Sequence, residues 1–408
     1  MSRSLLPNVA ASHGRALYGR EPLIFHCNHY NHHLQQTLLL PDIGMEEVIR
    51  DAAASVAYAA ISKAGDTPEA RAKVAADTFA ELGFGTIDFS KATAEGGVVV
   101  TPTSHYGQMT KLAREEPGTN HSTQQSFFDQ GYAAGALAAI HGLPARQFAA
   151  KAVSCLSVGD SEGRIELSKH EHLEDRLYRS AANGFGSGDV APPPYGDTSV
   201  DEGKTLEALS GLDFSGNEEG FIPRFGVVLT RHFANFYNRI SFEFVHRMSE
   251  MGLLEAAEDL LVNAGYHCAF NTFGGIMTSA EWDAVIKPQC QTKADWVHGM
   301  VATVNALGWG TWRVAEISDD KLVVRIYDDY ESRGYVGLYG TADRPICYLA
   351  RAGVVGTMNL VHVGDIASKP TLDRDFFVKV FESPDGFKVE ETKCMAMGDD
   401  YTEIVAWR

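Results

Sequence analysis

The chain has 408 residues, of which 45% are hydrophobic, and its formal net charge at pH 7 is −18. This composition is typical of a globular protein with a substantial core, and the length suggests two or three domains. The acidic excess argues against a nucleic-acid partner, because phosphate binding needs clustered lysine and arginine. No apolar run approaches a membrane span, and six scattered cysteines without a CxxC pair are typical of reduced thiols in the cytoplasm.

The sequence repeats itself. Residues 82–86 (LGFGT) recur as 307–311 (LGWGT), a shift of 225 residues, and 154–160 (SCLSVGD) recur as 393–399 (KCMAMGD). The step Tyr30-Asn31 also has a match in Tyr237-Asn238. Landmarks in the same order predict two copies of one domain. The predicted segments are an N-terminal arm (1–24), a first copy (25–167), a linker (168–220) and a second copy (221–408).

In chain order, helices are predicted over 45–64 and 68–82, the second with Pro68 in its first turn and Gly83 at its end. A strand follows over 97–101. The next helix, 130–141, contains Gly135, a small residue that permits close packing, and a hairpin ends the copy.

The linker is rich in glycine and proline and acidic in its second half, which favours an exposed segment long enough to wrap over one copy. The second copy repeats the pattern of the first. Its predicted elements are a helix over 294–307, strands over 311–317 and 321–326, a helix over 348–361 containing Gly356, and a hairpin over 387–392 and 402–407. The order predicts an α+β fold with antiparallel sheets. We expect the copies to pack with pseudo-twofold symmetry, as in a homodimer, and a homodimer of the whole chain is a further expectation.

The second copy resembles a known family. Residues 346–356 (ICYLARAGVVG), followed by 389–394 (VEETKC) and Gly398, resemble the 4-vinyl reductase domain. That family includes proteins linked to bacteriochlorophyll synthesis and sensor domains of aromatic-catabolism regulators. It shares its fold with transport-particle (TRAPP) subunits and, more distantly, with haem-based nitric oxide sensors. The resemblance covers most of 225–408 and, more weakly through the repeat, 25–167. It implies a small-molecule-binding α+β domain that often dimerises.

The resemblance also implies a metal site. In the sensor members, a zinc is held by a cysteine at a helix start, a glutamate, a cysteine three residues later and a cysteine eight beyond that. The first three positions fall on Cys347, Glu391 and Cys394, and the fourth falls on Thr402, which is not a zinc ligand. The first-copy positions are Ser126, Ala152, Cys155 and Gly163. Two thiolates and a carboxylate would suit zinc with an open position for water. The alternative is a decayed site in which the two cysteines are buried as hydrophobic residues.

A second candidate site is the histidine-rich segment 25–33 (FHCNHYNHH), of which the second copy keeps only His232. If the segment is helical, His26, His29 and His33 lie on one face. His29 and His33 have the spacing of metal-binding helices, and imidazole is a ligand for zinc and iron. Three interpretations stay open for this cluster: ligation of a metal or haem, direct contact with a substrate, and a structural role.

We expect an apolar cavity in each copy, with a few polar groups that orient a ligand. In the first copy the catalytic candidates are His26, His29, Tyr30 and His105. In the second copy the cofactor-binding candidates are His232, Tyr237 and Trp312. The metal candidates are His29, His33, Cys347, Glu391 and Cys394.

These features predict a metal-linked enzyme, with a metal-dependent oxidoreductase as the class considered. Its substrate would be a small apolar, aromatic or tetrapyrrole-like molecule, and its cofactor zinc, iron or haem. No P-loop or GxGxxG motif is found, so no nucleotide cofactor is expected. The alternative is a non-catalytic sensor or carrier of a small molecule, because the family members with the clearest roles bind rather than convert.

Overall fold

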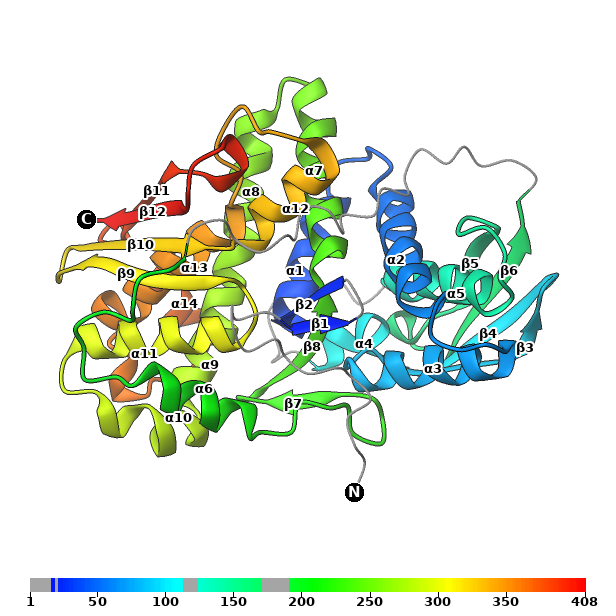
Figure 1. Ribbon diagram of the computed structural model, residues 1–408, viewed down its shortest axis with the longest axis horizontal. Coiled ribbons are helices and arrows are strands. Elements are labelled where there is room, and N and C mark those ends of the chain that lie inside the picture. The colour runs from blue at the N-terminus through cyan, green and yellow to red at the C-terminus, as the bar shows by residue number, and fades with distance from the viewer. Residues whose placement is uncertain (1–15, 19–20, 113–123, 171–190) are drawn as a thin grey trace.

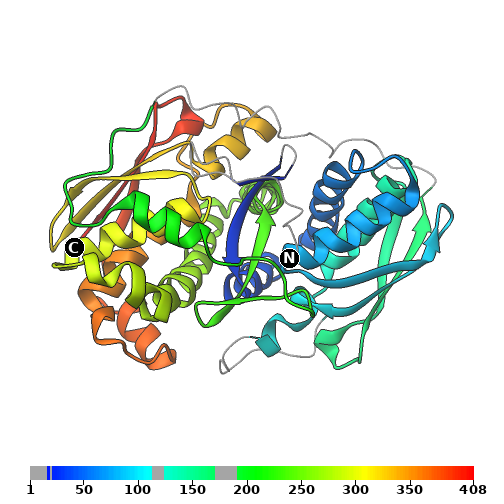
Figure 2. The same cartoon turned by 60° about the horizontal axis from the view of Figure 1, so that its bottom comes forward.

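The computed structural model describes residues 16–18, 21–112, 124–170 and 191–408. These residues form helices and three four-stranded antiparallel sheets, which confirms the α+β class. Each copy has a sheet of its own, and the third sheet lies between the copies (Figure 1, Figure 2).

The first copy lies on the right of Figure 1. Its helices are α1 (Asn28–Leu39), α2 (Met45–Ile61), α3 (Pro68–Glu81), α4 (His105–Leu112) and α5 (Phe127–Ile140). Its sheet has the order β3-β4-β6-β5, made of β3 (Gly85–Thr93), β4 (Gly96–Ser104), β5 (Phe148–Ser154) and β6 (Gly163–Lys169). The predicted helices, the strand around 97–101 and the closing hairpin are confirmed. Strand β3 was missed, although buried Ile87 and Phe89 alternate with exposed Asp88 and Ser90. The alternation is short, because Lys91 is also exposed and two register shifts interrupt the pairing.

The second copy repeats this arrangement. Its corresponding helices are α7 (Ala234–Glu250), α8 (Leu254–Cys268), α11 (Lys293–Ala306), α12 (Tyr330–Tyr339) and α13 (Tyr348–Met358). Its sheet, β9-β10-β12-β11, is made of β9 (Thr311–Ile317), β10 (Lys321–Tyr327), β11 (Lys388–Lys393) and β12 (Thr402–Trp407). Short helices α9 (Gly274–Thr278) and α10 (Ala280–Val285), and helix α14 (Arg374–Phe381), are additions without a first-copy counterpart. The predicted second-copy helices and strands are confirmed to within a few residues.

The shared sheet relates the two copies. Its order is β1-β2-β8-β7. Strand β1 (Ala16–Tyr18) lies in the N-terminal arm, β2 (Glu21–Cys27) runs from the arm into the first copy, and β7 (Ile222–Arg224) and β8 (Val227–Phe233) belong to the second copy. Cys27 and Phe233 are equivalent, as the N-cap residues of α1 and α7. Phe25 and Arg231 each lie two residues before these caps, and they pair directly across the antiparallel strands. A residue paired with its own counterpart marks a twofold axis, so the expected pseudo-twofold packing is confirmed.

This register corrects one match made from the sequence. Counting from the two N-caps, Tyr30 corresponds to Phe236 and Asn31 to Tyr237. The Tyr-Asn steps at 30–31 and 237–238 are therefore one position out of register. A dipeptide match is too short to fix an alignment, whereas the pairing of His26 with Thr230 and of Ile24 with His232 fixes it in space.

The described part of the linker contacts both copies. It contains helix α6 (Glu202–Ser210), whose Leu209 is buried. Glu202 Oε1 accepts hydrogen bonds from Asn305 Nδ2 at 2.7 Å and Arg313 Nη1 at 3.0 Å. Helix α6 thus packs on the second copy, whereas the end of the linker contacts the first copy, where the N–H of Gly85 donates to the carbonyl of Gly220 at 3.0 Å and Thr103 Oγ1 donates to the carbonyl of Glu219 at 2.7 Å.

Small residues allow the helices of each copy to touch, as predicted. A Cβ at Gly135 of α5 would lie 2.1 Å from the carbonyl oxygen of Ala54 in α2. A Cβ at Gly356 of α13 would lie 2.4 Å from the Cβ of Ala269, just after α8. One continuous hydrophobic core includes residues of both copies. Among the helices of the described residues, none is long and apolar enough to cross a membrane.

Candidate metal centre and dyad network

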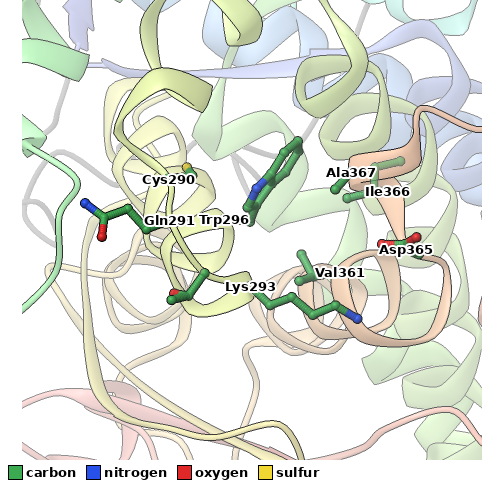
Figure 3. Close-up of a pocket in the computed structure, with 9 residues that line it drawn as sticks. Cys290, Gln291, Lys293, Trp296, Val361, Asp365, Ile366 and Ala367 are labelled. Atoms are coloured by element: carbon green, nitrogen blue, oxygen red, sulfur yellow. The ribbon is translucent and has the colours of Figure 1, made fainter.

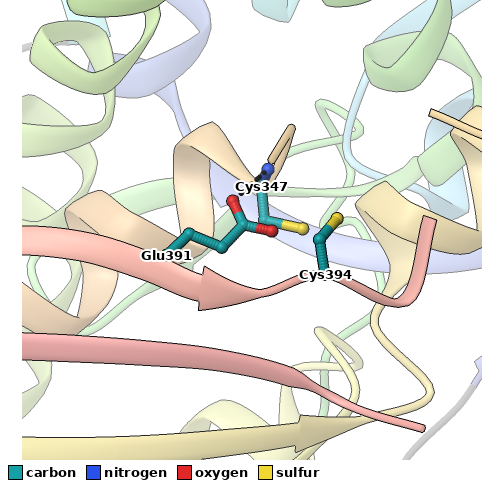
Figure 4. A group of neighbouring side chains, drawn as sticks. All are labelled: Cys347, Glu391 and Cys394. Atoms are coloured by element: carbon teal, nitrogen blue, oxygen red, sulfur yellow. Dashed lines mark hydrogen bonds between the residues drawn. The ribbon is translucent and has the colours of Figure 1, made fainter. Parts of the chain in front are cut away.

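Cys347, Glu391 and Cys394 come together in the second copy, as the family resemblance implies. Their ligand atoms all lie within 4.8 Å of one another, and no other group of three such residues does so in the part of the chain that the structure describes. Figure 4 shows the two sulfur atoms and the carboxylate turned toward one another. Cys347 is the N-cap of α13, Glu391 lies in β11, and Cys394 directly follows β11.

The loop after β11 fixes the position of Cys394. The backbone N–H of Cys394 donates to Asp399 Oδ2 at 2.9 Å, and Gly398 has a φ of 104°, which favours glycine. In the first copy, the N–H of Cys155 donates to Asp160 Oδ2 at 2.8 Å in the same way. The repeated motif at 154–160 and 393–399 is therefore a turn that places a cysteine at the end of a strand.

The three side chains are buried, with exposed fractions of 0% for both cysteines and 5% for Glu391. Burial, together with Cys394 and Asp329, raises the pKa of the Cys347 thiol well above its usual value. Contact with Cys347 lowers the pKa of Cys394 to about 6 despite burial. Burial and Cys394 raise the pKa of Glu391. The cluster therefore favours a thiolate at Cys394 beside a protonated Cys347 and a protonated Glu391. A cation bound among them would stabilise the ionised forms of all three side chains.

The donor chemistry fits a metal. Glu391 Oε2 accepts a hydrogen bond from the backbone N–H of Cys347 at 2.9 Å, whereas Oε1 is buried without a hydrogen-bond partner. An unsatisfied buried carboxylate oxygen is costly, and one that faces two sulfur atoms is a natural metal ligand.

Three further polar side chains surround this group, and two of them, Asp329 and Ser332, were missed in the sequence. Asp329 Oδ2 accepts hydrogen bonds from Cys347 Sγ at 2.6 Å, Ser332 Oγ at 2.9 Å and Thr402 Oγ1 at 3.1 Å. All three residues are buried. Asp329 and Ser332 lie at the start of α12, outside every segment that carries the resemblance, so only the tertiary structure brings them here.

The corresponding place in the first copy keeps the geometry and loses the ligands. Cys155 Sγ donates a hydrogen bond to Ser126 Oγ at 3.3 Å and lies 3.1 Å from Ser157 Oγ. Ala152 stands at the position of Glu391, on the same pairing of β5 with β6. A single thiol among hydroxyl groups is a structural contact, which agrees with the prediction that this copy retains only one ligand position.

The histidine-rich segment changes secondary structure in its middle, which contradicts the expectation of one helix. Strand β2 ends at Cys27 and α1 begins at Asn28, so His26 lies on the strand while His29 and His33 lie on the helix. The ring of His33 stacks on His267 at 3.5 Å between centroids. Within the described residues, His29 and His33 do not join a group of three close ligand atoms. Metal binding by these two residues stays a prediction.

His26 and His105 instead join a polar network at the pseudo-twofold axis, together with His232 and Tyr237 of the second copy. We call this group the dyad network. At its centre, Asn31 Nδ2 lies 2.9 Å from His105 Nε2 and 3.2 Å from Thr230 Oγ1. Tyr237 donates to Asn31 Oδ1, and Tyr106 OH lies 3.0 Å from His232 Nε2. The polar candidates of the two predicted pockets thus form one cluster between the copies, rather than two clusters.

The dyad network is deeply buried, and only some of its polar atoms have hydrogen-bond partners among the described residues. His26, His105 and His232 have exposed fractions of 0%. Among the described residues, each has a ring nitrogen without a hydrogen-bond partner: Nε2 of His26 and Nδ1 of the other two. Burial lowers the pKa of His26 and of His105 to about 3, and lowers that of His232 well below its usual value. These imidazoles are therefore neutral, and three of their nitrogen atoms have no protein partner.

A pair of thiols joins the copies beside this network. Cys268 Sγ at the end of α8 lies 3.7 Å from His26 Nδ1. Burial opposes ionisation of Cys27, but contacts with Cys268 and with His29 lower its pKa to about 6. All six cysteines are free, as the sequence suggested.

Tyr30 and Trp312 are both buried aromatic residues. Tyr30 lies beside His26, with 4.5 Å between ring centroids. Trp312 packs near Trp309 at 6.3 Å, and its backbone N–H donates to Asn305 Oδ1 at 2.7 Å. A cavity of only about 10 Å³ lies next to the dyad network, among Asn31, Gln35, Tyr106, Tyr237 and apolar side chains.

A larger pocket, of about 210 Å³, lies in the second copy (Figure 3). Trp296, Val361 and Ile366 provide apolar surface, and Lys293 and Asp365 provide charge. None of the ligand candidates from the sequence lines this pocket.

Comparisons with known proteins give little guidance. No family model matches the sequence, and no curated protein matches it. The structure has some similarity to the crystal structure of the phenol-responsive sensory domain of the transcription activator PoxR with phenol. The TM-score is 0.33 and the sequence identity 12%, over 49% of this chain and 88% of that one. A TM-score this low does not establish a common fold.

Proposed function

We propose that this protein is a non-catalytic binding protein whose second copy holds a zinc ion through Cys347, Glu391 and Cys394. The observation that carries the proposal is the convergence of two thiols and a carboxylate within 4.8 Å. Thiolate and carboxylate ligands suit zinc, and their burial suits a structural site, whereas a catalytic zinc keeps a position open to its substrate.

When bound, zinc would cross-link elements that are distant in the sequence. Cys347 caps α13, and Glu391 and Cys394 hold the end of β11. A metal here would clamp helix to sheet and stabilise the fold of the second copy, because the ligands are brought together only in the folded state.

Elemental analysis of the purified protein tests the proposal. We expect about one zinc per chain in the wild type, as one site of this type implies. Cys394→Ser should lose it, and Cys155→Ser, the matched change in the equivalent turn of the first copy, should retain it. A wild type without metal, or a Cys394→Ser variant with full metal content, would contradict the proposal. Stoichiometric iron that survives Cys394→Ser would favour the histidine-rich segment.

A second candidate function is the binding of a small aromatic molecule at the dyad network. It is supported by the three buried imidazoles whose ring nitrogens lack partners, because such groups are costly unless a water or a ligand satisfies them. The present cavity of about 10 Å³ has room for about one water molecule. A ligand would therefore have to displace neighbouring rings.

Tryptophan fluorescence provides the test, because the ring of Trp309 lies 5.1 Å from that of His26. Phenol is a suitable probe, since it combines one aromatic ring with one hydroxyl group. We expect saturable quenching that is weakened in His105→Gln and unchanged in His170→Gln, a change at an exposed residue. Quenching that rises linearly without saturation, and equally in all three proteins, would argue against this site.

A further inference from the structure

Asp329 is a buried carboxylate next to Cys347, one of the three proposed metal ligands. Its side chain is 1% exposed and lies at the start of α12, one residue before the helix begins. We infer that Asp329 is the fourth metal ligand of the site. It would take the part of the cysteine that the sensor members of the family have at the position of Thr402. The inference rests on the proposed function, since it concerns the same metal.

The two oxygens of Asp329 have different tasks. Oδ1 caps the helix by accepting a hydrogen bond from the backbone N–H of Glu331 at 3.0 Å. Oδ2 faces the thiol group of Cys347, 2.6 Å away, and is the acceptor for two hydroxyl groups as well. The helix cap thus holds the carboxylate in place while one oxygen is directed at the sulfur of an expected ligand.

The distance between Asp329 Oδ2 and Cys347 Sγ is compatible with two ligands of one metal once the proton between these atoms is replaced by that metal. In a tetrahedral zinc site with bonds of about 2.0–2.3 Å, ligand atoms lie roughly 3.3–3.8 Å apart. Cys347 now donates its proton to Asp329. Replacing that proton by zinc would require this sulfur and oxygen to separate by about 1 Å. Because Asp329 lies outside the group of three whose ligand atoms are within 4.8 Å of one another, its carboxylate would also have to move toward Glu391 and Cys394.

Thr402 has a supporting role in this arrangement. Its hydroxyl oxygen accepts a hydrogen bond from the backbone N–H of Met395 at 3.3 Å and donates its own proton to Asp329 Oδ2 at 3.1 Å. Because the Thr402 hydroxyl both accepts and donates a hydrogen bond, it orients the carboxylate of Asp329 rather than binding the metal. Hydrogen bonds of this kind to a ligating carboxylate are typical of metal sites.

The first copy provides an internal comparison. The 225-residue shift places Ser104 at the position of Asp329, and Ser104 Oγ there donates to Asp129. Gly163 stands in place of Thr402, and Ser126 in place of Cys347. The aspartate and its supporting hydroxyl therefore occur only in the copy that brings the other three ligands together.

The number of protein ligands decides the properties of the site. Three protein ligands would leave a position for water, whereas two thiolates and two carboxylates complete a tetrahedron. A closed site of this kind agrees with the burial of all four side chains.

Cobalt substitution tests the assignment, because the visible spectrum of Co²⁺ reports the number and type of its ligands. The variant Asp329→Asn keeps an N-cap residue and removes the charge. We expect it to weaken Co²⁺ and Zn²⁺ binding at least about tenfold, since loss of an outer-shell partner alone costs about 10- to 100-fold, and to change the d–d bands. Asp329→Cys should add intensity to the sulfur-to-cobalt charge-transfer band, because a third thiolate would reach the metal. Cys155→Ser, the matched change in the equivalent turn of the first copy, should leave the spectrum in its wild-type form.

The outcomes separate this inference from the proposed function. If Cys394→Ser abolishes binding while Asp329→Asn and Asp329→Cys retain the wild-type spectrum, the site exists but Asp329 is not a ligand. If Asp329→Asn weakens binding without a change in the d–d bands, Asp329 acts only through its neighbours, and the inference is also overturned. If the wild type binds no Co²⁺ or Zn²⁺, both proposals fail.

Discussion

Phe25 of β2 pairs with Arg231 of β8, and these two residues occupy the same position in the two copies of the domain. The guanidinium of Arg231 also lies 5.7 Å from the centroid of the Phe25 ring. The pair lies on the pseudo-twofold axis, next to the buried histidine network. The two copies therefore differ around one axis: the polar network lies on the axis, and the cluster of Cys347, Glu391 and Cys394 lies in the second copy alone among the described residues.

Removal of the metal should destabilise the protein. A ligand that binds only the folded state adds stability in proportion to the logarithm of its concentration, about 4 kcal/mol at a thousand times its dissociation constant. We expect a chelator to lower the thermal unfolding midpoint of the wild type, and added zinc to restore it. The Cys394→Ser variant should show neither response, and a wild type indifferent to the chelator would show that no metal supports the fold.

Asn31 should be a key residue of the dyad network, since its amide contacts His105, Thr230 and Tyr237. Asn31→Leu keeps the branched shape of the side chain with a larger volume, and it leaves buried partners without a hydrogen bond, at about 1–3 kcal/mol each. Urea denaturation should therefore show a loss of roughly 2–5 kcal/mol in the free energy of unfolding. At the exposed Asn263, the same substitution should change stability by no more than about 0.5 kcal/mol. Equal effects at both positions would argue against the network.

Acid should selectively weaken the wild type through His105. Burial lowers its pKa to about 3, whereas histidine in an unfolded chain titrates near about 6.5. The unfolded state therefore binds a proton that the folded state lacks, so stability is present above about pH 6.5 and is lost as the pH falls toward 3. In His105→Gln this dependence is absent.

The difference in unfolding free energy between the wild type and His105→Gln should accordingly shrink by roughly 1.5–2 kcal/mol between pH 6.5 and 5. Comparing the variant with the wild type cancels the titration of other groups, such as Asp129, whose pKa burial raises to about 7. His170→Gln, at an exposed site, should run parallel to the wild type. A parallel course for His105→Gln would mean that His105 is already protonated in the folded protein.

Gly135 should not tolerate a side chain. Because its Cβ would lie 2.1 Å from a backbone oxygen of α2, Gly135→Ala must force the two helices apart. We expect a loss of about 2–3 kcal/mol, as for other overpacked cores. Gly211→Ala, at the exposed end of α6 where the nearest atom is 3.4 Å away, is the control and should be close to neutral. Thermal unfolding of the two variants gives the comparison.

Much of the fold could be predicted because it follows from local patterns. Pro68 and Gly83 define the ends of one helix, which the structure has as α3. The repeat identified the two copies, and the resemblance placed Cys347, Glu391 and Cys394 together. Each of these inferences depends on residues close in sequence or on a motif already known.

The rest depends on contacts between distant segments. His26 belongs to a strand because β8 pairs with β2, and no pattern within 25–33 records a partner some 200 residues away. Asp329 was missed for a similar reason, since its visible local role is to cap α12. One sequence signal was available, since Asp329 is followed by a short helix and then by Cys347. The spacing of these residues, however, matches no motif of a metal site.

Anomalous X-ray diffraction at the zinc absorption edge tests the central claim most directly. A crystal of the wild-type protein should show one zinc peak within bonding distance of Cys347, Glu391 and Cys394, and no peak beside Cys155 in the first copy. A peak at His29 and His33 instead, or no peak between the two cysteines in zinc-supplemented crystals, would contradict the account.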